Sequence, residues 1–139
     1  MRRFVFACVH NAGRSQMAAA FFNAMADAAV ARAVSAGTEP GERVHPVVVE
    51  AMREVGIDLA GVQPQRLTDE MAAGAEMLIT MGCGEACPYV PGVEREDWPL
   101  ADPKGQAMEV VRGIREEIRG RVQDLIARKG VGRAAMIRS

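Results

Sequence analysis

Cysteine and aromatic residues are scarce in this sequence, and neither sign of charge is in clear excess. Its 139 residues include three cysteines, only 4% aromatic residues, and 17 basic against 18 acidic side chains. A small, odd number of cysteines does not suit a disulfide framework. A nucleic-acid-binding protein would usually be basic, and for single strands it would offer aromatic stacking surfaces. We therefore expect no nucleic acid partner.

Long hydrophobic runs are missing as well. The apolar residues 4–8 follow two arginines, but the run is too short for a signal peptide, and Asn11 and Arg14 interrupt its continuation. No stretch approaches the length of a membrane span. These absences predict a soluble, cytoplasmic protein with no membrane contact, whose thiols are reduced at rest.

The remaining composition is that of an ordinary globular domain, with 49% hydrophobic and 25% charged residues. A chain of this length suits one domain with one core, which we place at residues 1–129. Residues 130–139 carry two arginines and no acidic residue, and we expect them to form a disordered tail.

The hydrophobic pattern alternates between short apolar runs and helical spacing. Short apolar runs are typical of buried parallel strands, whereas apolar residues three and four positions apart indicate amphipathic helices. We expect strands at residues 4–7, 31–36, 77–81 and 93–98, and helices at residues 15–28, 47–55, 68–73 and 106–128. This order predicts an α/β fold, with a doubly wound parallel sheet covered by helices on both faces.

The segment between the first strand and the first helix reads Cys-Val-His-Asn-Ala-Gly-Arg-Ser, residues 8–15. A cysteine followed after five residues by an arginine is the spacing that wraps a backbone loop around a tetrahedral oxyanion. The N–H groups of such a loop and the positive end of the next helix face inward. The residues that we expect to form this oxyanion-binding loop are Val9, His10, Asn11, Ala12, Gly13, Arg14 and Ser15.

Three side chains of this segment have chemical roles in our interpretation. Arg14 offers a planar fork that binds two oxygens of the anion. The positive field favours the thiolate form of Cys8, which is then the nucleophile. Ser15 can cap the helix and donate a hydrogen bond to the Cys8 sulfur. The alternative is a buried structural cysteine beside a surface arginine, and we assign His10 no chemical role.

A phosphoryl-type reaction also needs an acid on the leaving-group oxygen. Asp102 precedes a proline, which biases its backbone to an extended conformation, and it follows the last expected strand at the sheet edge where ligands bind. Asp97, beside Trp98, is the second candidate. As an alternative to a general acid, an aspartate at this spacing could equally be a solvated loop residue or a cap for the last helix.

Several segments of the chain resemble the arsenate reductases of the low-molecular-weight tyrosine phosphatase superfamily. The resemblance runs in order, without large gaps, from Arg3 to about Lys129. It is carried by residues 8–18, 35–37, 56–58, 81–83, 97–98 and 102–103. It implies a doubly wound fold with a four-stranded parallel sheet, with Cys8 as nucleophile, Arg14 as oxyanion ligand and Asp102 as general acid.

Two departures from this resemblance bear on the substrate and on bound ions. Tyrosine phosphatases of the superfamily usually carry tyrosines just after the Asp-Pro, where this chain has Lys104 and Gly105. Many thioredoxin-coupled arsenate reductases help to hold a potassium ion with an acidic residue, where this chain has Ala19. A phosphotyrosine site is therefore poorly built, and we expect no tightly bound cofactor.

Cys83 and Cys87 follow the third expected strand, at the same sheet edge as Cys8. Arsenate is reducible, and the resemblance implies a relay in which Cys83 attacks the Cys8 adduct and Cys87 then takes over the disulfide. An exposed Cys83–Cys87 disulfide would be reduced by a thioredoxin-like protein. Residues 82–88 also resemble relatives that use mycothiol. A zinc site is the alternative for these cysteines, but neither His10 nor His45 shows ligand spacing.

We therefore expect an arsenate reductase whose partners are an oxyanion and an external thiol system. One alternative is a phosphatase acting on phosphotyrosine or a small phosphoester with Cys8, Arg14 and Asp102. Another is a non-catalytic oxyanion-binding or redox-sensing module. The cysteine trio favours the reductase, and the intact set of Cys8, Arg14 and Asp102 argues against a non-catalytic protein.

Overall fold

Four parallel strands form the sheet, and β1 lies at its centre. The computed structural model describes residues 1–133, except for the side chain of Glu85. The strands are β1 (Arg2–Cys8), β2 (Ala31–Gly37), β3 (Met77–Thr80) and β4 (Glu94–Asp97). Their spatial order is β2-β1-β3-β4, so both neighbours of β1 come from later in the chain. β1 pairs with β2 from Arg2↔Ala31 to Cys8↔Gly37.

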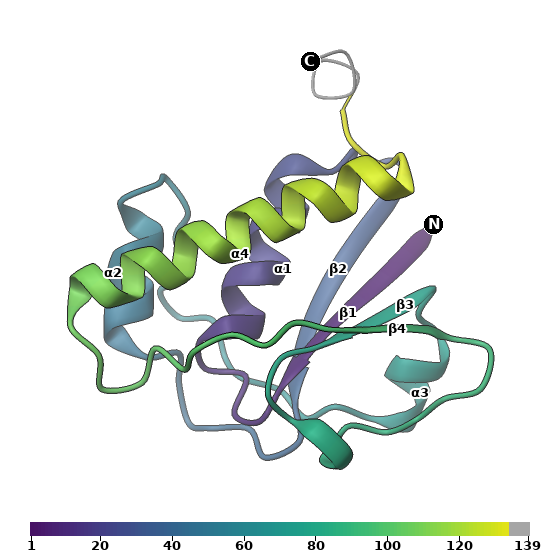
Figure 1. Ribbon diagram of the computed structural model, residues 1–139, viewed down its shortest axis with the longest axis horizontal. Helices are drawn as coiled ribbons and strands as arrows, with labels where there is room; N and C mark the ends of the chain where they lie inside the picture. The colour runs from purple at the N-terminus through teal and green to yellow at the C-terminus, as the bar shows by residue number, and fades with distance from the viewer. Residues whose placement is uncertain (134–139) are drawn as a thin grey trace.

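Helices cover both faces of this sheet (Figure 1). The larger core cluster packs under α1 (Arg14–Met25), α2 (Pro46–Arg53) and α4 (Met108–Lys129). The smaller cluster lies on the other face, where α3 (Asp69–Ala73) contributes Met71. A 3-10 turn, η1 (Gly84–Ala86), lies between β3 and β4. The expected four-stranded parallel sheet with helices on both faces is confirmed.

β1 is buried on both faces because its side chains are apolar in both directions. Phe4 and Phe6 belong to the larger cluster, whereas Val5 and Ala7 belong to the smaller one. Successive side chains of a strand point to opposite faces. Cys8 therefore leaves the sheet on the same face as Phe4 and Phe6, and it is counted in the larger cluster.

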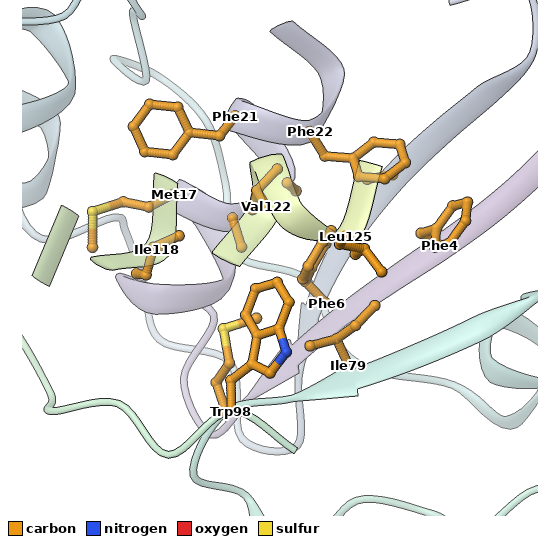
Figure 2. Close-up of a cluster of buried hydrophobic side chains, with 14 of the residues drawn as sticks. Phe4, Phe6, Met17, Phe21, Phe22, Ile79, Trp98, Ile118, Val122 and Leu125 are labelled. Atoms are coloured by element: carbon orange, nitrogen blue, oxygen red, sulfur yellow. The ribbon is translucent and has the colours of Figure 1, made fainter. Parts of the chain in front are cut away.

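Aromatic rings from β1, from α1 and from Trp98, the residue after β4, pack together in this larger cluster (Figure 2). The Phe22 ring lies 4.8 Å from the Phe4 ring and 6.0 Å from the Phe6 ring, and Trp98 lies 5.6 Å from Phe6, centre to centre. At such distances ring pairs add attraction beyond their burial. This packing holds α1 and Trp98 against β1. The first residue of the segment that leads to Asp102 is therefore fixed in the core.

α4 is held by its buried side and by ion pairs at both ends. Arg112 contacts Glu54 of the segment after α2 at 2.6 Å, and Arg128 contacts Glu96 of β4 at 3.0 Å. The Arg112 and Arg115 guanidinium groups lower the pKa of Glu54 to about 2. Its charged outer side sets α4 apart from a membrane segment, and within residues 1–133 no helix is both long and apolar enough to cross a membrane.

α1 ends three residues earlier than expected, although alanines continue beyond its end. The carboxylate of Asp27 accepts a hydrogen bond from the N–H of Ala29 at 3.0 Å, which forms a local turn in place of helix. The N–H of Asp27 donates to the carbonyl of Val131 at 2.8 Å. These two bonds override the helical preference of alanine, whereas every other expected element lies within two residues of its predicted bounds.

The start of the expected tail is packed onto the domain. Gly130 adopts a left-handed conformation with φ of 65° and closes α4, as glycine at this position commonly does. Val131 is buried, and Gly132 pairs with Ala26. The prediction that disorder begins at residue 130 is therefore wrong for these residues, while residues 134–139 lie outside the described part of the chain.

Candidate active site

The peptide groups of the loop after β1 are oriented by the segment that follows β2. At 2.7–3.2 Å, backbone N–H groups of this segment donate to loop carbonyls, in the pairs Thr38 to Cys8, Glu39 to Val9, Gly41 to His10 and His45 to Ala12. The C=O and N–H groups of a trans peptide point in opposite directions. Bonds made to the carbonyls from outside therefore turn the following N–H groups inward, which is the arrangement that an oxyanion needs.

Asn11 is the buried centre of the hydrogen bonds inside this loop. Its φ of 51° is left-handed, a conformation that asparagine tolerates better than most residues, and its N–H donates to the Cys8 sulfur at 3.3 Å. Its side-chain oxygen accepts from the backbone N–H of Gln65 at 3.0 Å, and its amide nitrogen donates to the Ser15 oxygen at 2.7 Å. Because a backbone N–H can only donate, the Gln65 bond determines which end of the amide faces Ser15.

This orientation leaves the Ser15 proton free to point at the nucleophile. Ser15 Oγ accepts from Asn11 and lies 2.9 Å from Cys8 Sγ. The Ser15 hydroxyl and the Asn11 N–H both lie within hydrogen-bond distance of the Cys8 sulfur. Ser15 is not the helix cap that we expected. The N-cap of α1 is Gly13, because the Ser15 hydroxyl is committed to Asn11 and Cys8.

Arg14 is the first residue of α1, and its guanidinium lies between the ends of β3 and β4. Nη1 donates to the carbonyl of Leu100 at 3.1 Å, and Nη2 lies 3.8 Å from a carboxylate oxygen of Asp102. Gly82 has φ of 87°, and a Cβ atom at that position would lie 2.6 Å from Nη1. The space beside Arg14 therefore depends on glycine at position 82.

The two candidate aspartates occupy different places. Asp102 lies beside Arg14, with its side chain about half exposed. Asp97 instead accepts a hydrogen bond from the Thr80 hydroxyl at 2.8 Å, which links β4 to β3. Of the two aspartates, Asp102 is thus the one that contacts Arg14, whereas Asp97 links two strands of the sheet.

His45 and Pro103 cover Gly13 at the start of α1. A Cβ atom on Gly13 would lie 2.8 Å from Pro103 Cγ and 3.5 Å from His45 Cδ2, so this close packing also requires glycine. Burial lowers the pKa of His45, with the Asp102 carboxylate acting in the opposite direction. His10 is exposed, and its ring nitrogen contacts the carbonyl oxygen of Glu39 at 2.9 Å.

Cys83 and Cys87 are bonded to each other in a disulfide. Both are buried, with 6% and 3% of their surface exposed, in the smaller core cluster. Cys83 Sγ lies 3.9 Å from the carbonyl oxygen of Ala7, the residue before Cys8. The pair thus lies next to the strand that carries Cys8, but against the opposite face of the sheet, and the expectation of an exposed disulfide is wrong.

Gln16 and Gln65 shape the site, although neither was assigned a role from the sequence. Gln16 donates from its amide to the backbone and side-chain oxygens of Asn11, both at 3.1 Å, and Gln65 acts as described above. A buried glutamine in a helix rich in alanine was the only available signal. Ala19, the position compared with a potassium ligand, is buried. Within residues 1–133, no three metal-ligating side chains gather in one group.

A thiol at the end of a central parallel strand, in a loop of inward-facing N–H groups that ends in an arginine, defines the cysteine-dependent phosphatase class of site. The family model described as low molecular weight phosphotyrosine protein phosphatase matches residues 3–135. The chain belongs to this family.

Relatives with arsenate reductase names are similar along most of the chain. The glutaredoxin arsenate reductase of Synechocystis sp. is 37% identical over 131 residues, which are 92% of this chain and 98% of that protein. A thioredoxin-dependent arsenate reductase structure from Corynebacterium glutamicum has a TM-score of 0.78 and 38% identity. That match covers 90% of this chain and spans 60% of the other. A structure described as an arsenate reductase in oxidized state has a TM-score of 0.81 and 36% identity, covering 92% and 98%.

Replacing Gly82 by alanine tests the position of Arg14. The new Cβ atom would displace the guanidinium, so we expect Gly82→Ala to weaken phosphate binding by about tenfold or more, the loss of a charged hydrogen bond. Isothermal titration with phosphate measures this. Gly92→Ala is the matched control, because Gly92 has nearly the same φ, 86°, and open space around its Cβ position. Equal affinities for the two variants would show that Gly82 does not make room for Arg14.

Proposed function

We propose that this protein is an arsenate reductase, in which Cys8 attacks arsenate and the resulting disulfide passes to Cys83 and Cys87. The observation that carries the proposal is the disulfide-bonded cysteine pair beside the strand that presents Cys8. A phosphatase needs the oxyanion-binding loop and an acid, but no further thiols. A reducible oxyanion does need them, and the arsenate reductase names of several relatives support this assignment.

In the first step, the Cys8 thiolate forms a bond to arsenic. The loop N–H groups and Arg14 bind the arsenate oxygens. Asp102 gives a proton to a hydroxyl group of the bound arsenate, and this group leaves as water while the sulfur–arsenic bond forms. The product is a covalent adduct between the Cys8 sulfur and arsenic, and arsenic is still in its oxidised state.

The second step moves two electrons to arsenic. The Cys83 thiolate attacks the Cys8 sulfur, the sulfur–arsenic bond breaks, and its electron pair leaves with arsenic as arsenite. A Cys8–Cys83 disulfide remains. The Cys87 thiolate then attacks Cys83 and releases Cys8 as a thiolate. The Cys83–Cys87 disulfide of the structure corresponds to this last state of the relay.

This relay requires Cys83 to move from the smaller core cluster to the sulfur of Cys8 on the other face. The residues on either side of Cys83 suit such a movement. Gly82 has φ of 87° and Gly84 has φ of 52°, and glycine changes between positive and negative φ at little cost. Because Cys83 already lies beside Ala7, the movement is a local one around the end of β3.

An external thiol system returns the two electrons. A thioredoxin-like protein, a glutaredoxin or mycothiol has the required chemistry, and the cytoplasm is the compartment in which such systems keep thiols reduced. Since both sulfurs are buried, the loop that carries them must open before an external thiolate reaches either one. The reductant therefore acts on an opened form of the oxidised protein.

A phosphatase activity shares the first half of this mechanism. The contact between Arg14 and Asp102 would serve a phosphoester as well as arsenate. Lys104 and Gly105 after the Asp-Pro are exposed and provide no aromatic wall for a phosphotyrosine ring. We therefore propose slow hydrolysis of small phosphoesters as a side activity that also depends on Cys8.

Asparagine in place of each candidate aspartate tests which one is the acid. Asp102→Asn removes the proton donor beside Arg14, and we expect arsenite release to slow by roughly 10²–10⁴-fold. Asp97→Asn alters only the bond to Thr80 and should have a much smaller effect. Single-turnover arsenite release measures both. The reverse ranking would assign the acid to Asp97.

Serine in place of each cysteine tests the order of the relay. Cys8→Ser should release no arsenite, because a serine hydroxyl is a weak nucleophile. Cys87→Ser should release about one arsenite per chain and stop as a Cys8–Cys83 disulfide, whereas Cys83→Ser should stop without an internal disulfide. Mass mapping of disulfides after each reaction identifies these states. Normal turnover of the Cys83 and Cys87 variants with mycothiol would contradict the relay.

A further inference from the structure

Arg95 of β4 contacts the loop that carries the disulfide at three carbonyl oxygens. We call residues 83–88 the redox loop. Nη1 of Arg95 donates to the carbonyls of Cys87 at 3.4 Å and Pro88 at 3.2 Å, and Nη2 donates to the carbonyl of Gly84 at 3.2 Å. These oxygens belong to both ends of the redox loop. A single side chain thus ties the two cysteine-bearing ends together.

The register of the sheet explains why Arg95 faces this loop. Arg95 pairs with Leu78, which lies in the same core cluster as Cys83 and Cys87. Its neighbours Glu94 and Glu96 point to the other face, where they form ion pairs with Lys129 and Arg128 of α4. On one face of the sheet, β4 is therefore held to α4 by ion pairs. On the other face, Arg95 of β4 is hydrogen-bonded to the redox loop.

We propose that Arg95 is a positioning residue that holds the redox loop in the conformation of the Cys83–Cys87 disulfide. This inference deepens the proposed function and rests on it for its role in the relay. The guanidinium has five N–H donors in a rigid plane, so it can serve several carbonyls only when they converge. They converge in the disulfide-bonded loop.

The contacts of Arg95 differ between the states of the relay. In the dithiol and in the Cys8–Cys83 disulfide, no bond joins Cys83 to Cys87, so nothing covalent holds the carbonyls of Gly84 and Cys87 together in front of Arg95. An interaction made in one state and not in another shifts the equilibrium toward the first. Arg95 therefore favours transfer of the disulfide from Cys8 to Cys87, and its bonds must break before the reductant enters.

Arg95→Met tests this proposal, because methionine keeps an apolar stem and removes the donors. The background is Cys8→Ser, so that only Cys83 and Cys87 react. In a buffer of glutathione and glutathione disulfide, the dithiol gives two electrons to glutathione disulfide and forms the internal disulfide. We expect Arg95→Met to lower the equilibrium constant for this reaction by about three- to tenfold, as the loss of exposed hydrogen bonds implies.

Arg32→Met is the matched control, since Arg32 is an exposed arginine on β2, the opposite edge strand of the sheet. It should leave the equilibrium constant unchanged. Equal constants for the Arg95 and Arg32 variants would overturn the proposal, because a merely structural role would weaken the oxidised and reduced proteins alike. No arsenate enters this measurement. Equal equilibrium constants would therefore overturn only the role of Arg95. A lack of arsenite release in the earlier experiments would instead overturn the proposed function.

Discussion

The site depends on the hydrogen bonds that turn the peptide groups of residues 8–13. The segment after β2 donates its N–H groups to the carbonyls of this loop, and the loop N–H groups then face inward. Gly37 permits this close approach, because a Cβ atom there would lie 2.6 Å from the carbonyl oxygen of Val9. Asn11 completes the arrangement from inside, with bonds to Gln65, Ser15 and the Cys8 sulfur. The loop carbonyls and the Cys8 sulfur thus belong to one connected set of hydrogen bonds.

The cysteines of the proposed mechanism lie on opposite faces of the sheet. Cys8 ends the central strand on the face covered by α1 and α4, whereas Cys83 and Cys87 lie buried on the other. In the proposed mechanism the oxyanion binds to a loop whose carbonyls are hydrogen-bonded to the segment after β2. The disulfide belongs to a loop that has a glycine on each side of Cys83 and is contacted by Arg95. The proposed disulfide relay requires that the loop after β1 stay in place while the loop that carries Cys83 and Cys87 moves.

The four parallel strands and most helix bounds were predictable, because the spacing of hydrophobic residues is a local feature of the chain. The Cys8–Arg14 spacing is local as well, and it directed attention to the loop between β1 and α1. The early end of α1 was not predictable, since it depends on a bond between Asp27 and Val131, which are distant in sequence. Gln65 and Arg95 were missed for the same reason. Each acts on a loop from another part of the chain. The burial of the disulfide depends on which face of the sheet receives the loop after β3, and no spacing in the sequence specifies that face.

Arsenite release from the reduced wild-type chain in the absence of any external thiol tests the central claim most directly. The protein is reduced, freed of reductant and mixed with excess arsenate. Arsenite and disulfides are then quantified. The account predicts release of about one arsenite per chain, a Cys83–Cys87 disulfide and a free thiol at Cys8, because the three cysteines hold the two electrons needed. Arsenite that appears only after an external thiol is added would contradict it.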